Sequence, residues 1–92
     1  MISSMAKTET KITAKAAQEL FGKKCITDMP KMKKAFAKNG TKVHHVQYFM
    51  SPDPLTGALE LEANMVFGNG QDPANCDQLF WHGSKKLWYH CG

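Results

Sequence analysis

The chain begins with a polar segment, and apolar residues recur with helical spacing only after it. Residues 1–11 show no periodicity, and we expect them to form a flexible arm. Thr13 suits an N-cap, the apolar positions of residues 14–21 form one stripe, and Gly22 can end the helix. The pattern predicts a short helix directly after the arm.

A second helical stripe follows, and its opposite face is basic. Thr27 is a candidate N-cap, Pro30 is tolerated in a first turn, and Asn39-Gly40 is a typical stop signal. The buried face is predicted to carry Met29, Met32 and Phe36. At about 100° per residue, the face opposite that stripe carries Lys31, Lys34 and Lys38, with Lys33 on its flank.

The pattern then changes to the alternation of strands. Residues 42–50 are rich in β-branched and aromatic side chains, and a turn with a left-handed residue is expected in PDPLTG before the next strand. Apolar and polar residues alternate along that strand, and the apolar side chains should face the core: Leu59, Leu61, Ala63, Met65 and Phe67.

The last part of the chain predicts a loop and an aromatic hairpin. Residues 68–75 have loop composition, and Gly83-Ser84 reads as a two-residue turn that would pair His82 with Lys85 and His90 with Asp77. We therefore predict an α+β fold in which two N-terminal helices pack on a small antiparallel sheet of three to four strands. Residues 12–92 would form one domain, because the chain of 92 residues is too short for two.

Charge is distributed unevenly along this chain. The formal net charge is +4, but residues 1–42 carry ten lysines against three acidic residues, or +7, whereas residues 43–92 carry −3. Hydrophobic content of 42% predicts a folded domain rather than a disordered one. No apolar run is long enough for a membrane span or a signal peptide, and three cysteines cannot all pair, so we expect a cytoplasmic protein.

The spacing of histidines and cysteines argues against a metal site. No C-x-x-C or H-x₃₋₅-H pattern occurs, and His44 and His45, adjacent in a strand, should point to opposite faces. The alternation of the strand explains Glu60 and Glu62 as residues on its solvent-exposed side. No common nucleophile or phosphate-loop motif is present. We expect a protein that is not an enzyme and needs no cofactor.

Lysines are the strongest candidates for function. Seven lie within residues 23–42 and only Asp28 offsets them, which favours a binding face over a merely solvated helix. The chain has no arginine, so it lacks the bidentate fork that reads guanine edges, and sequence-specific readout is not expected. The candidate contacts to phosphate or an acidic partner are Lys23, Lys24, Lys31, Lys33, Lys34, Lys38, Lys42, Lys85 and Lys86.

Aromatic residues allow two interpretations. Most should be core, but alternation puts the neighbours Phe80 and Trp81, and likewise Trp88 and Tyr89, on opposite faces. Aromatic residues on the solvent-exposed face of the sheet would be candidate anchors of an interface with a partner. We take Tyr48, Trp81 and Trp88 as the candidate anchors.

Two functions are compatible with these patterns. Helix, glycine turn, lysine-rich helix and strand pair can be interpreted as a winged-helix-like DNA-binding regulator, although Pro30 lies in the recognition helix of such a motif. The whole chain, through ITAKAAQELFGKK, KMKKAFAKNG, HHVQYF, GALELEANMVF and LFWHGSKKLWYHC, resembles phage-encoded anti-CRISPR proteins, particularly those that act on type I-F complexes.

That resemblance covers residues 12–91 and is one of size and architecture. It implies a monomeric, stoichiometric inhibitor in the host bacterial cytoplasm. Such an inhibitor binds the CRISPR RNA-guided surveillance complex, through Cas subunits and in some cases guide RNA, and blocks recognition of target DNA. Many members are acidic DNA mimics, and the +7 front of this chain departs from that pattern.

Overall fold

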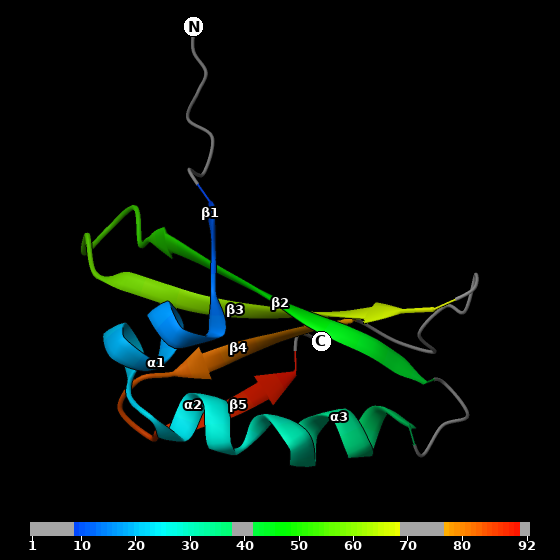
Figure 1. Cartoon of the computed structure of the whole chain (residues 1–92). Helices are drawn as coiled ribbons and strands as arrows, with labels where there is room; N and C mark the ends of the chain where they lie inside the picture. Colours follow the sequence, from blue (N-terminus) through cyan, green and yellow to red (C-terminus); the bar gives the residue numbers. More distant parts are fainter. Residues whose placement is uncertain (1–8, 38–41, 69–76, 91–92) are drawn as a thin grey trace, which may run out of the picture.

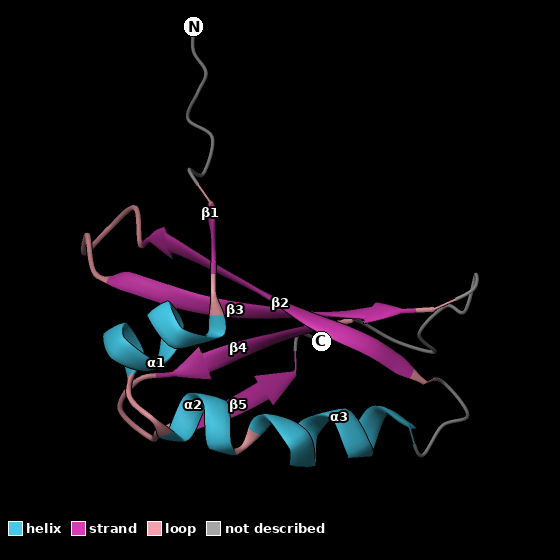
Figure 2. Ribbon diagram, in the orientation of Figure 1, coloured by secondary structure: helices cyan, strands magenta, loops and turns pink. Residues whose placement is uncertain are grey.

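Helices occupy one side of a single antiparallel sheet. The computed structural model describes residues 9–37, 42–68 and 77–90. Figures 1 and 2 show the helices crossing the sheet on one side, with α3 along one margin. The elements are β1 (Thr10–Ile12), α1 (Ala14–Phe21), α2 (Lys24–Thr27), α3 (Met29–Ala37), β2 (Val43–Pro52), β3 (Leu59–Phe67), β4 (Gln78–His82) and β5 (Leu87–His90).

The predicted α+β class is confirmed, but the sheet has five strands. They lie in the order β1-β2-β3-β4-β5, and each neighbouring pair is antiparallel. The additional strand is β1, whose Thr10 and Lys11 pair with Met50 and Phe49. Two residues assigned to the arm therefore belong to the sheet, and one strand precedes the helices. Residues 1–8 of the predicted arm lie outside the described part.

Helix α1 begins and ends as the sequence predicts. The Ala16 N–H donates to the Thr13 side chain at 3.1 Å, which is a standard N-cap. Gly22 has a φ of 105°, and its N–H donates to the Gln18 carbonyl at 2.9 Å. A positive φ suits glycine because the residue has no Cβ to clash.

The second predicted helix is divided into α2 and α3 at Asp28. Thr27 is not an N-cap: it lies inside α2 and its hydroxyl donates to the Lys24 carbonyl at 3.4 Å. The cause is Pro30, whose missing N–H removes the bond that would continue α2 without a break. The predicted stop at Asn39-Gly40 lies outside the described residues.

The hairpin between β2 and β3 forms around the predicted left-handed glycine. Gly57 has a φ of 76°, and its N–H donates to the Asp53 carbonyl at 2.7 Å. The Asp53 side chain also accepts from the Leu55 N–H at 2.8 Å. This turn aligns nine residues of β3 with β2, which is the longest pairing in the sheet.

The β4–β5 turn differs from the two-residue prediction. It contains Gly83 to Lys86, so His82 pairs with Leu87 rather than Lys85, and His90 pairs with Leu79 rather than Asp77. Lys86 takes a φ of 56° and donates its N–H to the His82 carbonyl at 2.8 Å. Four-residue turns built in this way commonly end on a left-handed residue, which glycine does not have to supply.

The core lies between the helices and the inner face of the sheet. Met29 and Phe36 are buried, as predicted, and Met32 packs against them. The Trp88 Nε1–H donates to the Cys25 carbonyl at 2.9 Å and ties β5 to α2. The strand β3 contributes Leu61, Ala63 and Met65, whereas Leu59 at its beginning remains exposed.

Two titratable groups are enclosed in this core. Burial raises the pKa of the Cys25 thiol from 9.0 to about 11, although a bond to backbone opposes this shift. Burial also raises the pKa of Tyr48 to about 12, and the nearby Cys25 adds to that shift. Both groups are uncharged in the folded protein at neutral pH.

Candidate functional site: a basic groove beside helix α3

The face of α3 that carries lysines is set by its apolar stripe. Met29 and Phe36 point into the core, and Phe36 stacks on the His90 ring with centroids 4.9 Å apart. That docking turns Lys31 and Lys34 to solvent and leaves Lys33 half-buried on the flank, as predicted. Lys38, expected on the same face, lies outside the described residues.

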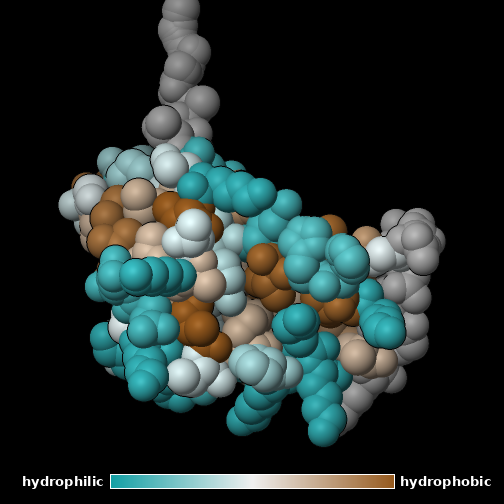
Figure 3. All heavy atoms as spheres, viewed as in Figure 1, coloured by the Kyte–Doolittle hydropathy of each residue, from teal (hydrophilic) through white to brown (hydrophobic). Residues whose placement is uncertain are grey.

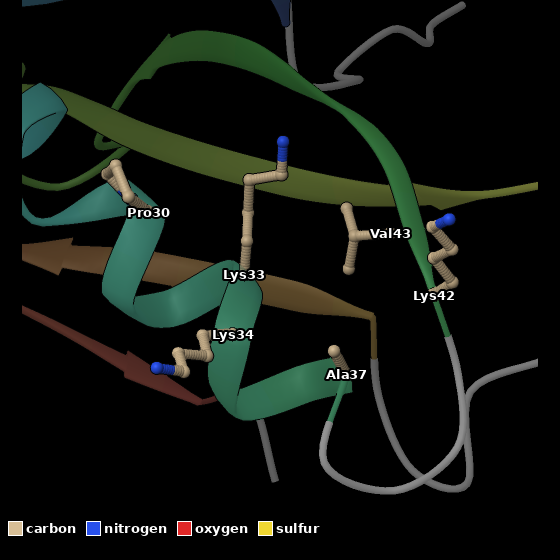
Figure 4. A pocket seen from close by; sticks show the side chains of 6 residues that line it. All are labelled: Pro30, Lys33, Lys34, Ala37, Lys42 and Val43. Atoms are coloured by element: carbon tan, nitrogen blue, oxygen red, sulfur yellow. The ribbon is translucent and has the colours of Figure 1, made fainter.

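A groove of about 380 Å³ lies between α3 and the start of β2. Figure 4 shows Lys33 reaching from α3 toward the sheet, Lys42 following β2 on the other side, and Lys34 pointing away from the helix. Hydrophobic surface appears between hydrophilic side chains on this side of the molecule (Figure 3). We call this the basic groove, and its lining residues are Pro30, Lys33, Lys34, Ala37, Lys42 and Val43.

The basic groove combines ammonium groups with an apolar floor. Its volume falls within the roughly 300–1,000 Å³ range of ligand sites in proteins. Within residues 9–37, 42–68 and 77–90, no carboxylate forms a salt bridge with Lys31, Lys33 or Lys34. An anionic group on a partner would therefore meet Lys33 and Lys34, whose charge no described carboxylate neutralises by a salt bridge.

The remaining candidate lysines lie in two other places. Lys23 and Lys24 flank the start of α2, where Lys24 forms an i,i+4 salt bridge with Asp28 at 2.7 Å. Lys85 and Lys86 are exposed in the β4–β5 turn. Figure 1 shows this turn at the end of the sheet near α1, away from the end of α3 that borders the groove. The predicted lysines that the structure describes thus do not form one continuous site.

The three aromatic residues predicted as interface anchors belong to the core. Tyr48, Trp81 and Trp88 are only 7%, 8% and 6% exposed, respectively. All three lie on the inner face, which the helices cover. Neighbouring aromatic residues lie on opposite faces of the sheet, as predicted, but the tryptophans face the core. The outer face carries Tyr89, which is 47% exposed, and Phe80 beside it.

The histidine pair in β2 does not alternate as expected. Val43 pairs with Phe67 and His45 with Val66, which leaves His44 as the extra residue of a β-bulge. A bulge interrupts the alternation, so both histidines are exposed and their ring centroids lie 5.1 Å apart. Among the residues that the structure describes, no group of three histidine, cysteine or acidic side chains could hold a metal ion.

The described carboxylates of β3 and the cysteines suggest structural roles. Glu62 accepts from the Gln78 side-chain amide at 2.9 Å, a bond between neighbouring strands. Cys25 is fully buried and its thiol lies 3.6 Å from the Ala17 carbonyl. Cys76 and Cys91 lie outside the described residues.

Sequence reasoning identified the lysines of the groove but missed its apolar lining. Pro30 and Ala37 belong to α3 and Val43 to β2, so their proximity depends on how α3 docks beside β2. The only local signal for Val43 was its place at the start of a strand, which gives no information about the helix opposite.

Comparisons with known proteins identify no relative. No family model, no curated protein and no solved structure matches this chain. None of the helices in the described segments has the length and apolar character needed to cross a membrane.

Proposed function

We propose that this protein acts by binding, through the basic groove, to an anionic surface of a large macromolecular assembly. The observation that carries the proposal is that Lys33 and Lys42 line opposite sides of one apolar groove, with Lys34 at its margin. The assembly that we propose is a CRISPR RNA-guided surveillance complex, which combines protein subunits with guide RNA phosphates. The protein would then be a stoichiometric inhibitor that blocks recognition of target DNA.

The chemistry of the groove favours docking without base readout. Lysine provides a hydrated point charge that tolerates several phosphate or carboxylate geometries. An apolar floor adds binding free energy because it removes nonpolar surface from water. Binding of this kind weakens steeply with salt where counterions are released from nucleic acid.

Lysine substitutions with equal charge change provide the central test. Lys33→Glu/Lys34→Glu and Lys15→Glu/Lys23→Glu each reduce the formal net charge from +4 to 0, but only the first pair alters the groove. We expect the groove variant to lose binding to a purified type I-F surveillance complex loaded with guide RNA. The control should retain at least half of the wild-type occupancy.

The functional readout is retention of labelled target DNA by the same complex. Inhibition should become complete near a fixed molar ratio of protein to complex, because the protein blocks by occupancy and not by turnover. Failure to bind the complex at any ratio would overturn the inhibitor assignment. Retention of free duplex DNA as the sole ligand would instead support the winged-helix-like regulator.

Circular dichroism and urea unfolding separate loss of binding from loss of folding. Lys34 is exposed and Lys33 half-buried, so both double variants should unfold within about 1 kcal/mol of wild type. Loss of binding in both variants to the same degree would show that net charge alone matters, and it would contradict a role for the groove.

A further inference from the structure

The face of the sheet opposite the helices carries a row of side chains from all five strands. The register aligns Lys11 with Phe49, Phe49 with Glu62, Glu62 with Phe80 and Phe80 with Tyr89. These residues alternate with the buried positions of their strands, so they share the outer face. The proposed docking through the basic groove does not use this face.

Aromatic rings on the outer face form a continuous group over β4 and β5. Phe80 and Tyr89 have ring centroids 5.8 Å apart, and the His82 ring lies edge-on to Tyr89 at 5.9 Å. Tyr89 is 47% exposed and Leu87, on the same strand and face, is 42% exposed. We call Phe49, Phe80, His82 and Tyr89 the outer aromatic surface.

Amide side chains lie directly beside these rings. Gln47, Asn64 and Gln78 are aligned across β2, β3 and β4 in the adjacent row. The Gln78 amide donates to Glu62, whereas the Asn64 Oδ1 is covered and has no hydrogen-bond partner. This face therefore places the Gln47 amide and the hydrogen-bonded Glu62–Gln78 pair beside ring surfaces on which a base can stack.

Lysines border the outer aromatic surface at two places. Lys11 lies on β1 next to Phe49, and Lys85 lies in the turn that joins β4 to β5. Lys86 of the same turn lines a hollow with Leu61 and Trp81 on the inner side of the sheet. The Lys85 N–H is 3.4 Å from the His82 Nδ1, which places the turn directly against the aromatic group. The cations thus stand at the margins of the rings, where a phosphate backbone would pass.

We propose that the outer aromatic surface binds single-stranded RNA. Unstacked bases lie flat on aromatic side chains and hydrogen-bond through their edges, and the phosphates require nearby cations. The order of lysine, aromatic and amide groups across this sheet meets each requirement. The carboxylate of Glu62 can accept from base amino groups or from a 2′-hydroxyl, which favours RNA over DNA.

A protein partner fits this face less well. A dry interface over the row would bury the amide of Gln47 beside the hydrogen-bonded Glu62–Gln78 pair, and a polar group that such an interface leaves without a partner costs free energy. A second copy would bring the same carboxylate and amide row against itself. Bases carry both donors and acceptors at their edges, so they complement such a mixed surface.

The test is titration of the isotope-labelled full-length protein with a ten-nucleotide single-stranded RNA of mixed sequence. We expect backbone amide signals of Phe49, Phe80 and Tyr89 to shift. Tyr89→Ala should weaken binding about 5- to 100-fold, which is the loss of one stacked base, whereas Tyr89→Phe should stay within about threefold of wild type. Leu87→Ala is the matched control on the same strand and face, and it should also stay within about threefold.

Other ligands and variants give results that would overturn the proposal. Equal or tighter binding of a DNA strand of the same sequence would contradict the assignment to RNA. A base-paired RNA duplex that shifts the same signals would show that charge, not stacking, drives binding. Self-association through the outer face in the absence of RNA would also contradict it.

The experiment tests the outer aromatic surface and the basic groove independently of each other. Signals that shift only around Lys33 and Lys34 would overturn the outer aromatic surface and leave the groove as the anion site. Binding that survives Lys33→Glu/Lys34→Glu but is lost in Tyr89→Ala would support the outer surface, whatever the outcome with the surveillance complex.

Discussion

The two faces of the sheet carry matching aromatic pairs in different surroundings. On the inner face, Trp81 and Trp88 are cross-strand neighbours with ring centroids 5.3 Å apart, and both are buried under the helices. On the outer face, Phe80 and Tyr89 form the same kind of pair at 5.8 Å, and Tyr89 is 47% exposed. The same cross-strand geometry thus supports the core on one face and presents a surface on the other.

This difference shows how a small domain divides its aromatic residues. Cross-strand aromatic pairs stabilise a sheet by about 0.2–1 kcal/mol each. Only the inner pair adds burial against helices and the hydrogen bond from Trp88 to Cys25. The inner pair should therefore dominate stability, and the outer pair should be free to serve binding.

The largest expected effect separates the two pairs directly. Trp88→Ala should lower the free energy of unfolding by about 3–5 kcal/mol, because it leaves a cavity and removes the donor to the Cys25 carbonyl. Tyr89→Ala should cost less than about 1 kcal/mol. Urea unfolding followed by circular dichroism measures both, and Trp88→Phe provides a milder variant if the alanine protein does not fold. Equal costs would show that the outer pair is packed as tightly as the inner one.

Two leucines on β3 test the same contrast within one strand and one face. Leu61 is 1% exposed, whereas Leu59 is 47% exposed and lines an open hollow beside Leu20 and Phe21 of α1. Leu61→Ala should lower the free energy of unfolding by about 2–5 kcal/mol, and Leu59→Ala by less than about 1 kcal/mol. A large cost at Leu59 would extend the core to the end of the strand.

The buried thiol predicts a loss of stability at high pH. The pKa of Cys25 is about 11 in the folded protein against 9.0 in its ordinary state, so between these values the unfolded chain releases a proton that the folded protein retains. Stability should therefore fall as the pH rises from about 9 to about 11, by about 1–3 kcal/mol from this group. Tyr48 acts in the same direction at higher pH, because its pKa is also raised.

Unfolding in urea at several pH values measures this slope, with Cys25→Ala as the comparison that removes the thiol. The variant should lose less stability than wild type over the same range. Identical slopes in the two proteins would contradict a buried, protonated thiol.

The smallest effect concerns the turn that sets the register of both aromatic pairs. Lys86 has a φ of 56°, a conformation that disfavours side chains with a Cβ. Lys86→Gly should raise the free energy of unfolding by about 0.5–1 kcal/mol, whereas Lys85→Gly should not raise it. A gain at both positions would point to the unfolded chain rather than to the strained turn.

Alternation allowed the faces of β4 and β5 to be predicted even though the turn was wrong. The predicted turn was two residues shorter than the observed one, and a shift by two residues keeps every side chain on its face. The prediction failed for His44 and His45 because the bulge inserts one residue, which changes the face of one neighbour. A shift of the register by an even number of residues keeps each side chain on its face of the sheet, and a shift by an odd number does not.

The candidate site was predictable only in part. The placement of Lys31 and Lys34 opposite the Met/Phe stripe, with Lys33 on its flank, follows from helical periodicity, so those lysines could be named. The aromatic anchors could not, because alternation splits Trp81 from Phe80 without saying which of them the helices will cover. The structure shows Trp81 inside and leaves the outer face to Phe80 and Tyr89.

Local sequence patterns specify the N-cap and end of α1, the apolar stripe of α3, the left-handed turn at Gly57 and the basic character of the helices. Each depends on residues within a few positions of one another. Packing of the folded chain, by contrast, places Thr10–Ile12 in the sheet, brings Val43 opposite α3 across a groove and sets which aromatic face is exposed. Those features depend on contacts between segments far apart in the chain, and local patterns of charge and hydropathy do not specify them.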